Sequence, residues 1–199
     1  MIKAVVFDLG KVLLDFDYGV AAKNLAKNSS RPAGEIRPLI DQSPLLLRYE
    51  RAQITTTEFF AAVRESIGFR GAFDDFAAAF ADIFTEVPDM TQLNRELRER
   101  GVPTFVLSNT NEIAISHIRH RFPFFTEFSG YIFSFEHGVL KPEPRIYEIA
   151  GNCTGCRGSE ILFLDDNPAN VEGALKAGWR TICHRAPGES VEMVRELIN

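Results

Sequence analysis

A series of short apolar runs, alternating with segments of helical periodicity, constrains the fold of this chain more than any other feature. The first run, residues 2–7, is rich in β-branched side chains and ends at an aspartate followed by Leu9 and Gly10, which is typical of a buried strand. Further runs lie at 103–107, 131–134, 161–164 and 180–183, and helical patterns at 90–100, 111–121, 143–151 and 169–178 separate most of them. This alternation predicts a Rossmann-like α/β fold with a parallel sheet.

Residues 16–87 show a different pattern, because their apolar residues recur at helical spacing without the alternation of a strand. Within this stretch Thr55, followed by Glu58, predicts a helix N-terminus closed by a capping box. We therefore expect an α/β core of residues 1–14 and 88–199, interrupted by an all-helical insertion at 15–87.

The composition of the chain bears on its binding partners and its cellular compartment. The net charge of −5 among 199 residues gives no reason to expect a nucleic acid or an anionic membrane. The N-terminus lacks the long apolar segment of a signal peptide, and no stretch approaches the roughly 20 apolar residues of a membrane span. Three cysteines without framework spacing favour a reducing compartment. We expect a cytoplasmic monomer or homodimer.

Polar residues follow four of the predicted strands at the point where each strand ends. In chain order they are Asp8, Ser108 with Asn109, Lys141, and Asp165 with Asp166. The carboxyl ends of parallel strands share one edge of a sheet, where ligands of such folds bind. We therefore expect a nucleophile, a hydroxyl, a cation and an acidic pair to converge there.

This set of side chains matches the needs of phosphoryl transfer, which requires a nucleophile, donors to phosphate oxygens and a neutralising metal. Asp8 would attack phosphorus, while Ser108, the backbone amides after it and Lys141 would hold the phosphate. Asp8 and Asp166 would bind a hard cation such as Mg²⁺, with Asp165 in its outer shell or orienting water. Neighbouring carboxylates are hard to keep ionised without a cation, which favours the metal.

The order and spacing of four segments resemble the haloacid dehalogenase-like (HAD) superfamily over essentially the whole chain. The segments are FDLGKVL (7–13), LSNT (107–110), GVLKPEPRIY (138–147) and FLDDNPANVEGA (163–174). The resemblance implies an aspartyl-phosphate on Asp8 and a helical cap formed by the insertion. The Mg²⁺ ligands that it implies are Asp8, the Gly10 carbonyl, Asp166 and Asp165, and the implied phosphate ligands are Ser108, Asn109 and Lys141.

The DLG form of the first segment and ERAQIT at 50–55 are most similar to the bacterial α-D-glucose-1-phosphate phosphatase-like branch, related to the N-terminal domain of soluble epoxide hydrolase. That branch implies a small phosphorylated metabolite, a sugar phosphate, as substrate. Most phosphatases of the superfamily carry an acid–base aspartate two positions after the nucleophile, where this chain has Gly10. A substrate with an acidic leaving group would need less protonation. Alternatively Lys11, Asp15, Asp17, a water or the substrate itself would supply the proton.

Two other functions are compatible with Gly10. Haloacid dehalogenases use the same nucleophile and also lack the second aspartate, but they need no metal, so the Asp165–Asp166 pair argues against that activity. A phosphate-binding regulator with little turnover is the other alternative.

Other polar residues carry weaker signals. Cys153 with Cys156 lacks the second ligand pair of a zinc site, so we interpret the cysteines as structural or incidental. His117 with His120 lacks a third nearby ligand, so we expect a solvated helix face there. Five cap residues near turns would either face the active site and select the substrate or form surface ion pairs. They are Tyr18, Arg48, Tyr49, Glu50 and Arg51.

Overall fold

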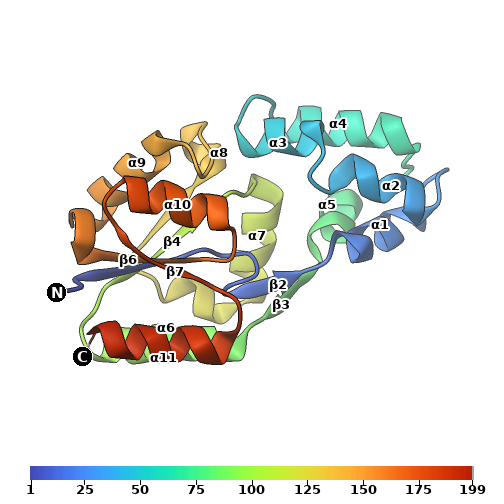
Figure 1. The fold of residues 1–199 in the computed structure, drawn as a ribbon. Helices are drawn as coiled ribbons and strands as arrows, with labels where there is room; N and C mark the ends of the chain where they lie inside the picture. Colours follow the sequence, from blue (N-terminus) through green and yellow to red (C-terminus); the bar gives the residue numbers. More distant parts are fainter. Residues whose placement is uncertain (199) are drawn as a thin grey trace.

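A five-stranded parallel sheet forms the centre of the molecule, for which a computed structural model describes residues 1–198 (Figure 1). Across the sheet the strand order is β5-β4-β1-β6-β7. The strands are β1 (Ala4–Phe7), β4 (Thr104–Ser108), β5 (Gly130–Phe133), β6 (Ile161–Asp165) and β7 (Arg180–Cys183). All five predicted strands are therefore confirmed, and their parallel pairing places every carboxyl end at one edge.

Helices cover both faces of this sheet, with α6 and α11 side by side on one face and α9 and α10 on the other (Figure 1). The core helices are α6 (Pro88–Glu99), α7 (Glu112–Arg121), α8 (Ser134–His137), α9 (Pro144–Thr154), α10 (Pro168–Lys176) and α11 (Pro187–Ile198), with 3₁₀ turns η1 (Pro123–Thr126) and η2 (Gly158–Glu160). The four helices predicted in the core are confirmed. Within residues 1–198, no helix combines the length and the apolarity that crossing a bilayer requires.

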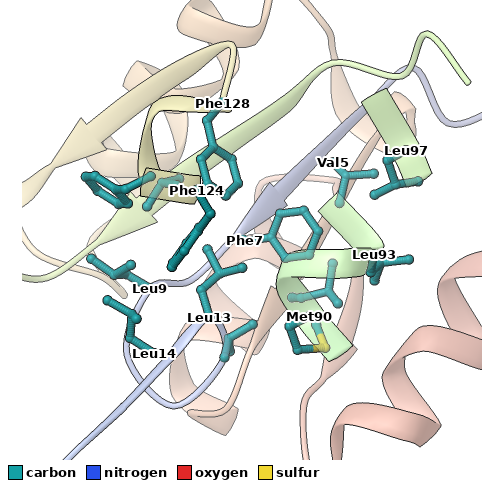
Figure 2. Close-up of a cluster of buried hydrophobic side chains, with 14 of the residues drawn as sticks. Val5, Phe7, Leu9, Leu13, Leu14, Met90, Leu93, Leu97, Phe124 and Phe128 are labelled. Carbon is teal, nitrogen blue, oxygen red and sulfur yellow. The ribbon is translucent and has the colours of Figure 1, made fainter. Parts of the chain in front are cut away.

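The alternation of side chains along β1 explains why both faces need cover. Val5 and Phe7 point into a cluster with Met90 and Leu93 of α6 (Figure 2). Residues 4 and 6 of the same strand point into a second cluster, which α9 and α10 close. Because strand side chains alternate between faces, a strand that is apolar throughout must be buried on both sides.

The insertion folds as a separate group of five helices beside the sheet (Figure 1). They are α1 (Tyr18–Ala26), α2 (Ala33–Ile40), α3 (Pro44–Glu50), α4 (Thr56–Ile67) and α5 (Phe73–Ala81). Stacked and edge-on rings of Phe59, Phe76 and Phe80 form its core, with centroids 5.4–6.2 Å apart. The predicted capping box is present, since Thr55 Oγ1 accepts from the Glu58 N–H and Glu58 Oε2 accepts from the Thr55 N–H.

The expectation of an all-helical insertion is wrong at its base. There β2 (Leu14–Phe16) and β3 (Phe84–Glu86) form an antiparallel pair that connects the helices to the core. Strands of three residues are too short to show the alternation by which a strand is detected. The domain boundaries at 15 and 87 stay a prediction.

Candidate active site

Asp8 lies directly after β1, at the edge where the strands end. Its backbone N–H donates to Leu164 O at 2.8 Å, which continues the pairing of β1 with β6. Its Oδ1 atom accepts from the Leu9 N–H at 2.6 Å and from Lys141 Nζ at 2.7 Å. The residue is only 8% exposed. The second carboxylate oxygen makes no hydrogen bond within residues 1–198, which suits a nucleophile.

Lys141 reaches the same place from the loop that follows α8. Its ammonium bridges Asp8 Oδ1 at 2.7 Å and Asp165 Oδ2 at 2.6 Å, and the residue is 4% exposed. Asn109 holds its backbone, because the Lys141 N–H donates to Asn109 Oδ1 at 2.8 Å and Asn109 Nδ2 donates to Lys141 O at 3.0 Å. The Asn109 side chain is therefore a support for the lysine.

Asp165 is completely buried, and its oxygens are fully used. Asn170 Nδ2 donates to both of them at 3.0 and 3.1 Å, and the Asn167 N–H donates to Oδ1 at 2.8 Å. Asn170, in the first turns of α10, is a site residue that sequence reasoning missed. The available signal was a polar residue within the segment at 163–174, about one helical turn after the N-cap Asn167.

The three carboxyl groups predicted to hold a metal do meet. Asp8, Asp165 and Asp166 each place an oxygen within 4.8 Å of the others. Burial raises the pKa of Asp8 well above its usual range, and the other two carboxylates add to this effect while Lys141 opposes it. Burial also raises the pKa of Asp166, with Asp165 as the next cause.

These shifts show an excess of buried negative charge that one ammonium does not balance. Burial by itself lowers the pKa of Lys141, but Asp8 and Asp165 raise it above its ordinary value, so the lysine stays charged. Burial raises the pKa of Asp8 more than the Lys141 charge lowers it. A donor set made only of carboxylate oxygens with surplus negative charge fits a hard divalent cation such as Mg²⁺.

A cavity of about 270 Å³ lies over this group of residues, between the core and the cap. Six predicted site residues line it, namely Asp8, Gly10, Ser108, Asn109, Lys141 and Asp166. Asp165 does not line it and lies beneath Lys141, which agrees with an outer-shell position. The cap side of the cavity includes Tyr18, Asp41, Gln42, Leu46, Leu47 and Glu50.

The five cap residues considered from the sequence take different positions. Tyr18 and Glu50 line the cavity. Tyr49 is buried in the cap, stacked on Phe59 at 4.5 Å between centroids, and Arg51 pairs with Glu143 of the core at 2.9 Å. Arg48 does not line the cavity. Of these five residues, therefore, Tyr18 and Glu50 border the cavity and the other three do not.

The cysteine and histidine pairs remain outside the site. Within residues 1–198, the cluster of Asp8, Asp165 and Asp166 is the group found with metal-binding geometry, and it includes no histidine or cysteine. Cys153 and Cys156 are free thiols. Their interpretation as structural residues is consistent with this arrangement.

Comparison with known proteins identifies the family to which this chain belongs. A sequence model of the haloacid dehalogenase-like hydrolases matches residues 2–178, so the chain belongs to this family of hydrolases. The D-ribitol-5-phosphate phosphatase of Bacteroides thetaiotaomicron is 26% identical over 193 residues, which cover 91% of each protein. Mouse acyl-CoA dehydrogenase family member 10 is 27% identical over 98% of this chain, but the chain spans only 19% of that protein.

A solved structure shares the arrangement of the whole chain. The wild-type HAD family enzyme bt-2542 of Bacteroides thetaiotaomicron, in complex with magnesium and inorganic phosphate, has a TM-score of 0.82 and 27% identity. The match covers 94% of this chain and 96% of that one. The predicted α/β fold and family are confirmed.

Proposed function

We propose that this protein is a Mg²⁺-dependent phosphatase that hydrolyses a small phosphomonoester through an aspartyl-phosphate on Asp8. One observation carries the proposal: a buried aspartate at a strand end shares a lysine with a second carboxylate, beside a third, at the floor of a cavity between the core and the cap. The similarity to phosphatases, and to a structure that holds magnesium and phosphate, supports it.

The core residues that border the cavity have separate roles in the proposed phosphoryl transfer. Asp8 attacks phosphorus in line with the leaving alcohol, which departs toward the cap. Ser108 Oγ, the Asn109 backbone N–H and Lys141 Nζ donate to the phosphate oxygens and stabilise the charge that develops on them. Asn109 and Asn170 keep Lys141 and Asp165 in place, so the donors need not reorganise during the reaction.

Asp8, Asp166 and the Gly10 carbonyl would hold the Mg²⁺, with Asp165 assisting. When bound, the ion would neutralise phosphate and carboxylate charge, which permits an anion to attack an anion. The same ion would keep Asp8 a carboxylate, against the burial that raises its pKa.

The substrate that we propose is the phosphate ester of a small hydroxylated alcohol, such as a sugar or polyol. The cap side of the cavity offers the Tyr18 phenol, the Gln42 amide and the carboxyl groups of Asp41 and Glu50. These groups suit hydroxyls of a neutral alcohol and disfavour a second phosphate. A relative that acts on D-ribitol 5-phosphate supports this class.

The geometry argues against the two alternatives. Dehalogenation needs no cation, yet Asp166 adds a further charge to a site already rich in carboxylates. A regulator with little turnover would not require a nucleophile with a free oxygen beneath a cavity. Both alternatives are decided by the same assay.

The test is hydrolysis of a panel comprising sugar phosphates, polyol phosphates, nucleotides and p-nitrophenyl phosphate, with and without Mg²⁺. We expect phosphate release that depends on Mg²⁺, is greatest for a sugar or polyol ester, and is lost in Asp8→Asn. Full activity in Asp8→Asn would refute the nucleophile. Metal-independent consumption of 2-haloacids would establish dehalogenation instead, and no release from any ester would favour a binding role.

A further inference from the structure

Position 10 has no room for the acid–base side chain that the reaction lacks. A Cβ atom built on Gly10 would lie 2.7 Å from Cε1 of Phe16, well inside contact distance. The ring of Phe16 is held between Tyr18 and Phe84, at 5.8 and 6.1 Å between centroids. Lys11 Nζ covers it at 4.7 Å from the ring centre. The proton must therefore come from elsewhere.

The nearby candidates from the β2 segment are already engaged. Lys11 donates both to Asp15 Oδ1 and to the Phe16 carbonyl. The hydrogen bond from Lys11 lowers the pKa of Asp15, which keeps that carboxyl an anion and unable to donate a proton. Asp17 caps α1 by accepting from the Gly19 N–H at 2.7 Å. Neither Asp15 nor Asp17 lines the cavity.

Glu50, the last residue of α3, offers a carboxyl group in the right place. It lines the same cavity as Asp8 and Lys141, but from the cap side, where the leaving alcohol would lie. It is half-buried, and it makes no hydrogen bond or ion pair with any of residues 1–198. By contrast Asp41, the other cap carboxylate in the cavity, is paired with Arg37 at 3.1 Å.

The charged and titratable groups around Glu50 favour its neutral form. Burial raises its pKa to about 7. Burial, followed by the nearby charge of Glu50, raises the pKa of Tyr18 of α1, whereas Arg51, the residue after Glu50, is paired with Glu143. Burial is the cause that acts on this carboxyl, and no cation among residues 1–198 opposes it. A group that exchanges its proton near neutral pH suits acid–base work.

We propose that Glu50 is the acid–base residue of this enzyme, delivered by the cap to the side of the cavity opposite Asp8. This rests on the proposed phosphatase reaction. As Asp8 forms its bond to phosphorus, the bond from phosphorus to the leaving oxygen breaks, and that oxygen takes the proton of Glu50. The Glu50 carboxylate then removes a proton from water, whose oxygen attacks phosphorus. Phosphate and the Asp8 carboxylate are released, with Glu50 again protonated.

If Glu50 protonates the leaving oxygen, replacing Glu50 should change how strongly the cleavage rate depends on the acidity of the leaving group. The experiment is single-turnover release of alcohol from p-nitrophenyl phosphate and from phenyl phosphate, with enzyme and Mg²⁺ in excess. Phenol, with an ordinary pKa of about 10, needs protonation as it leaves, whereas nitrophenol is much more acidic. We expect Glu50→Gln to slow the phenyl ester by about 10²-fold or more and the nitrophenyl ester by only a few fold.

Matched variants separate this role from others. Glu65→Gln makes the same change on the exposed side of α4 and should leave both rates within about twofold of the wild type. In the wild type the phenyl ester rate should fall above pH about 7, and this fall should be absent in Glu50→Gln. Lys11→Gln tests the rival donor in the cavity.

Three results would overturn the assignment: equal slowing of both esters in Glu50→Gln, no slowing of either, or a selective loss of the phenyl ester in Lys11→Gln. Equal slowing would show a binding or positioning role. Absence of any turnover in the wild type would instead refute the phosphatase activity itself. The failure of the Glu50 role and the failure of the proposed function are therefore distinguishable. Retention of the wild-type leaving-group dependence in Glu50→Gln, with Asp8→Asn inactive, would refute Glu50 alone.

Discussion

The core and the cap present charged side chains to the same cavity, but they hold them differently. On the core side the buried charges hold one another: Lys141 bridges Asp8 and Asp165, and Asn170 holds Asp165. On the cap side Glu50 has no bonded partner among residues 1–198. A phosphate group is the same in every ester, so these rigidly held core residues, which form the floor of the cavity, suit it. The alcohol varies, and the proton has to move, which suits groups that are not locked in place.

The strongest way to break this comparison is Asp8→Asn, which removes the nucleophile from an otherwise intact floor. We expect kcat for the best phosphate ester to fall by at least about 10⁴-fold, because an amide does not attack phosphorus. Steady-state turnover at saturating Mg²⁺ measures this. Asp89→Asn, an exposed aspartate on α6, should leave activity unchanged. A loss below tenfold would show that the floor works without Asp8.

Lys141→Met tests whether the charges of the floor are mutually dependent. The change leaves Asp8 and Asp165 buried without their cation, so we expect a loss of about 3–5 kcal/mol in the free energy of unfolding at pH 8. The loss should shrink toward pH 5, because Asp8, whose pKa is raised, takes up a proton. Urea unfolding with a chelator at both pH values measures it, and equal losses would contradict the interpretation.

Glu50→Gln sharpens the comparison through the free energy of unfolding, because no ion pair among residues 1–198 stabilises the Glu50 carboxylate. Burial raises the pKa of Glu50 from 4.5 to about 7, so ionisation destabilises the fold progressively between these values. The cost is absent below pH 4.5 and complete above 7. Relative to the wild type, Glu50→Gln should gain on the order of 3 kcal/mol between pH 4.5 and 8.

The control for that gain is Glu65→Gln, because Glu65 is exposed on the same cap. Its free energy of unfolding should follow the wild type at every pH. If Glu50→Gln also followed the wild type, the Glu50 carboxyl would be hydrated and its environment different from the one described.

The smallest effect is expected from Arg51→Ala, which removes the ion pair between cap and core. The pair is half-exposed, so we expect a change in unfolding free energy below about 1 kcal/mol. Since Arg51 and Glu143 join α3 to the loop of Lys141, KM should rise by a few fold with kcat nearly unchanged. Arg48→Ala, on the preceding helix α3 and, like Arg51, outside the cavity lining, is the matched control. A larger fall in kcat than in KM would contradict this role.

Much of the fold could be predicted because its signals are local. Apolar runs long enough to be buried on both faces identified all five core strands, and the Thr55 capping box identified the start of α4. The β2–β3 ribbon was not predicted, because each strand has only three residues and is stabilised by a partner strand far along the chain. Its strands become recognisable only when paired.

The floor of the site was predictable for a related reason. In a parallel sheet the residues at the carboxyl end of each strand are placed by the backbone register, so Asp8, Ser108 and Asp165 converge wherever their strands pair. The role of the Asn109 side chain was less accessible, because its amide turns toward Lys141 in a contact between residues 32 positions apart. Asn170 was not predicted, because the neighbouring sequence does not indicate that its side chain is buried against Asp165.

By itself, then, the sequence determined the α/β core, the helical insertion and the polar residues at the strand ends, since periodicity and register depend on neighbours along the chain. Only the tertiary structure decided that Phe16 fills the space beside Gly10, and that Glu50 rather than Arg48 or Tyr49 faces the cavity. Which side of a short helix meets the core depends on how the cap packs and docks. That packing sums many weak contacts between distant residues, which no local pattern records.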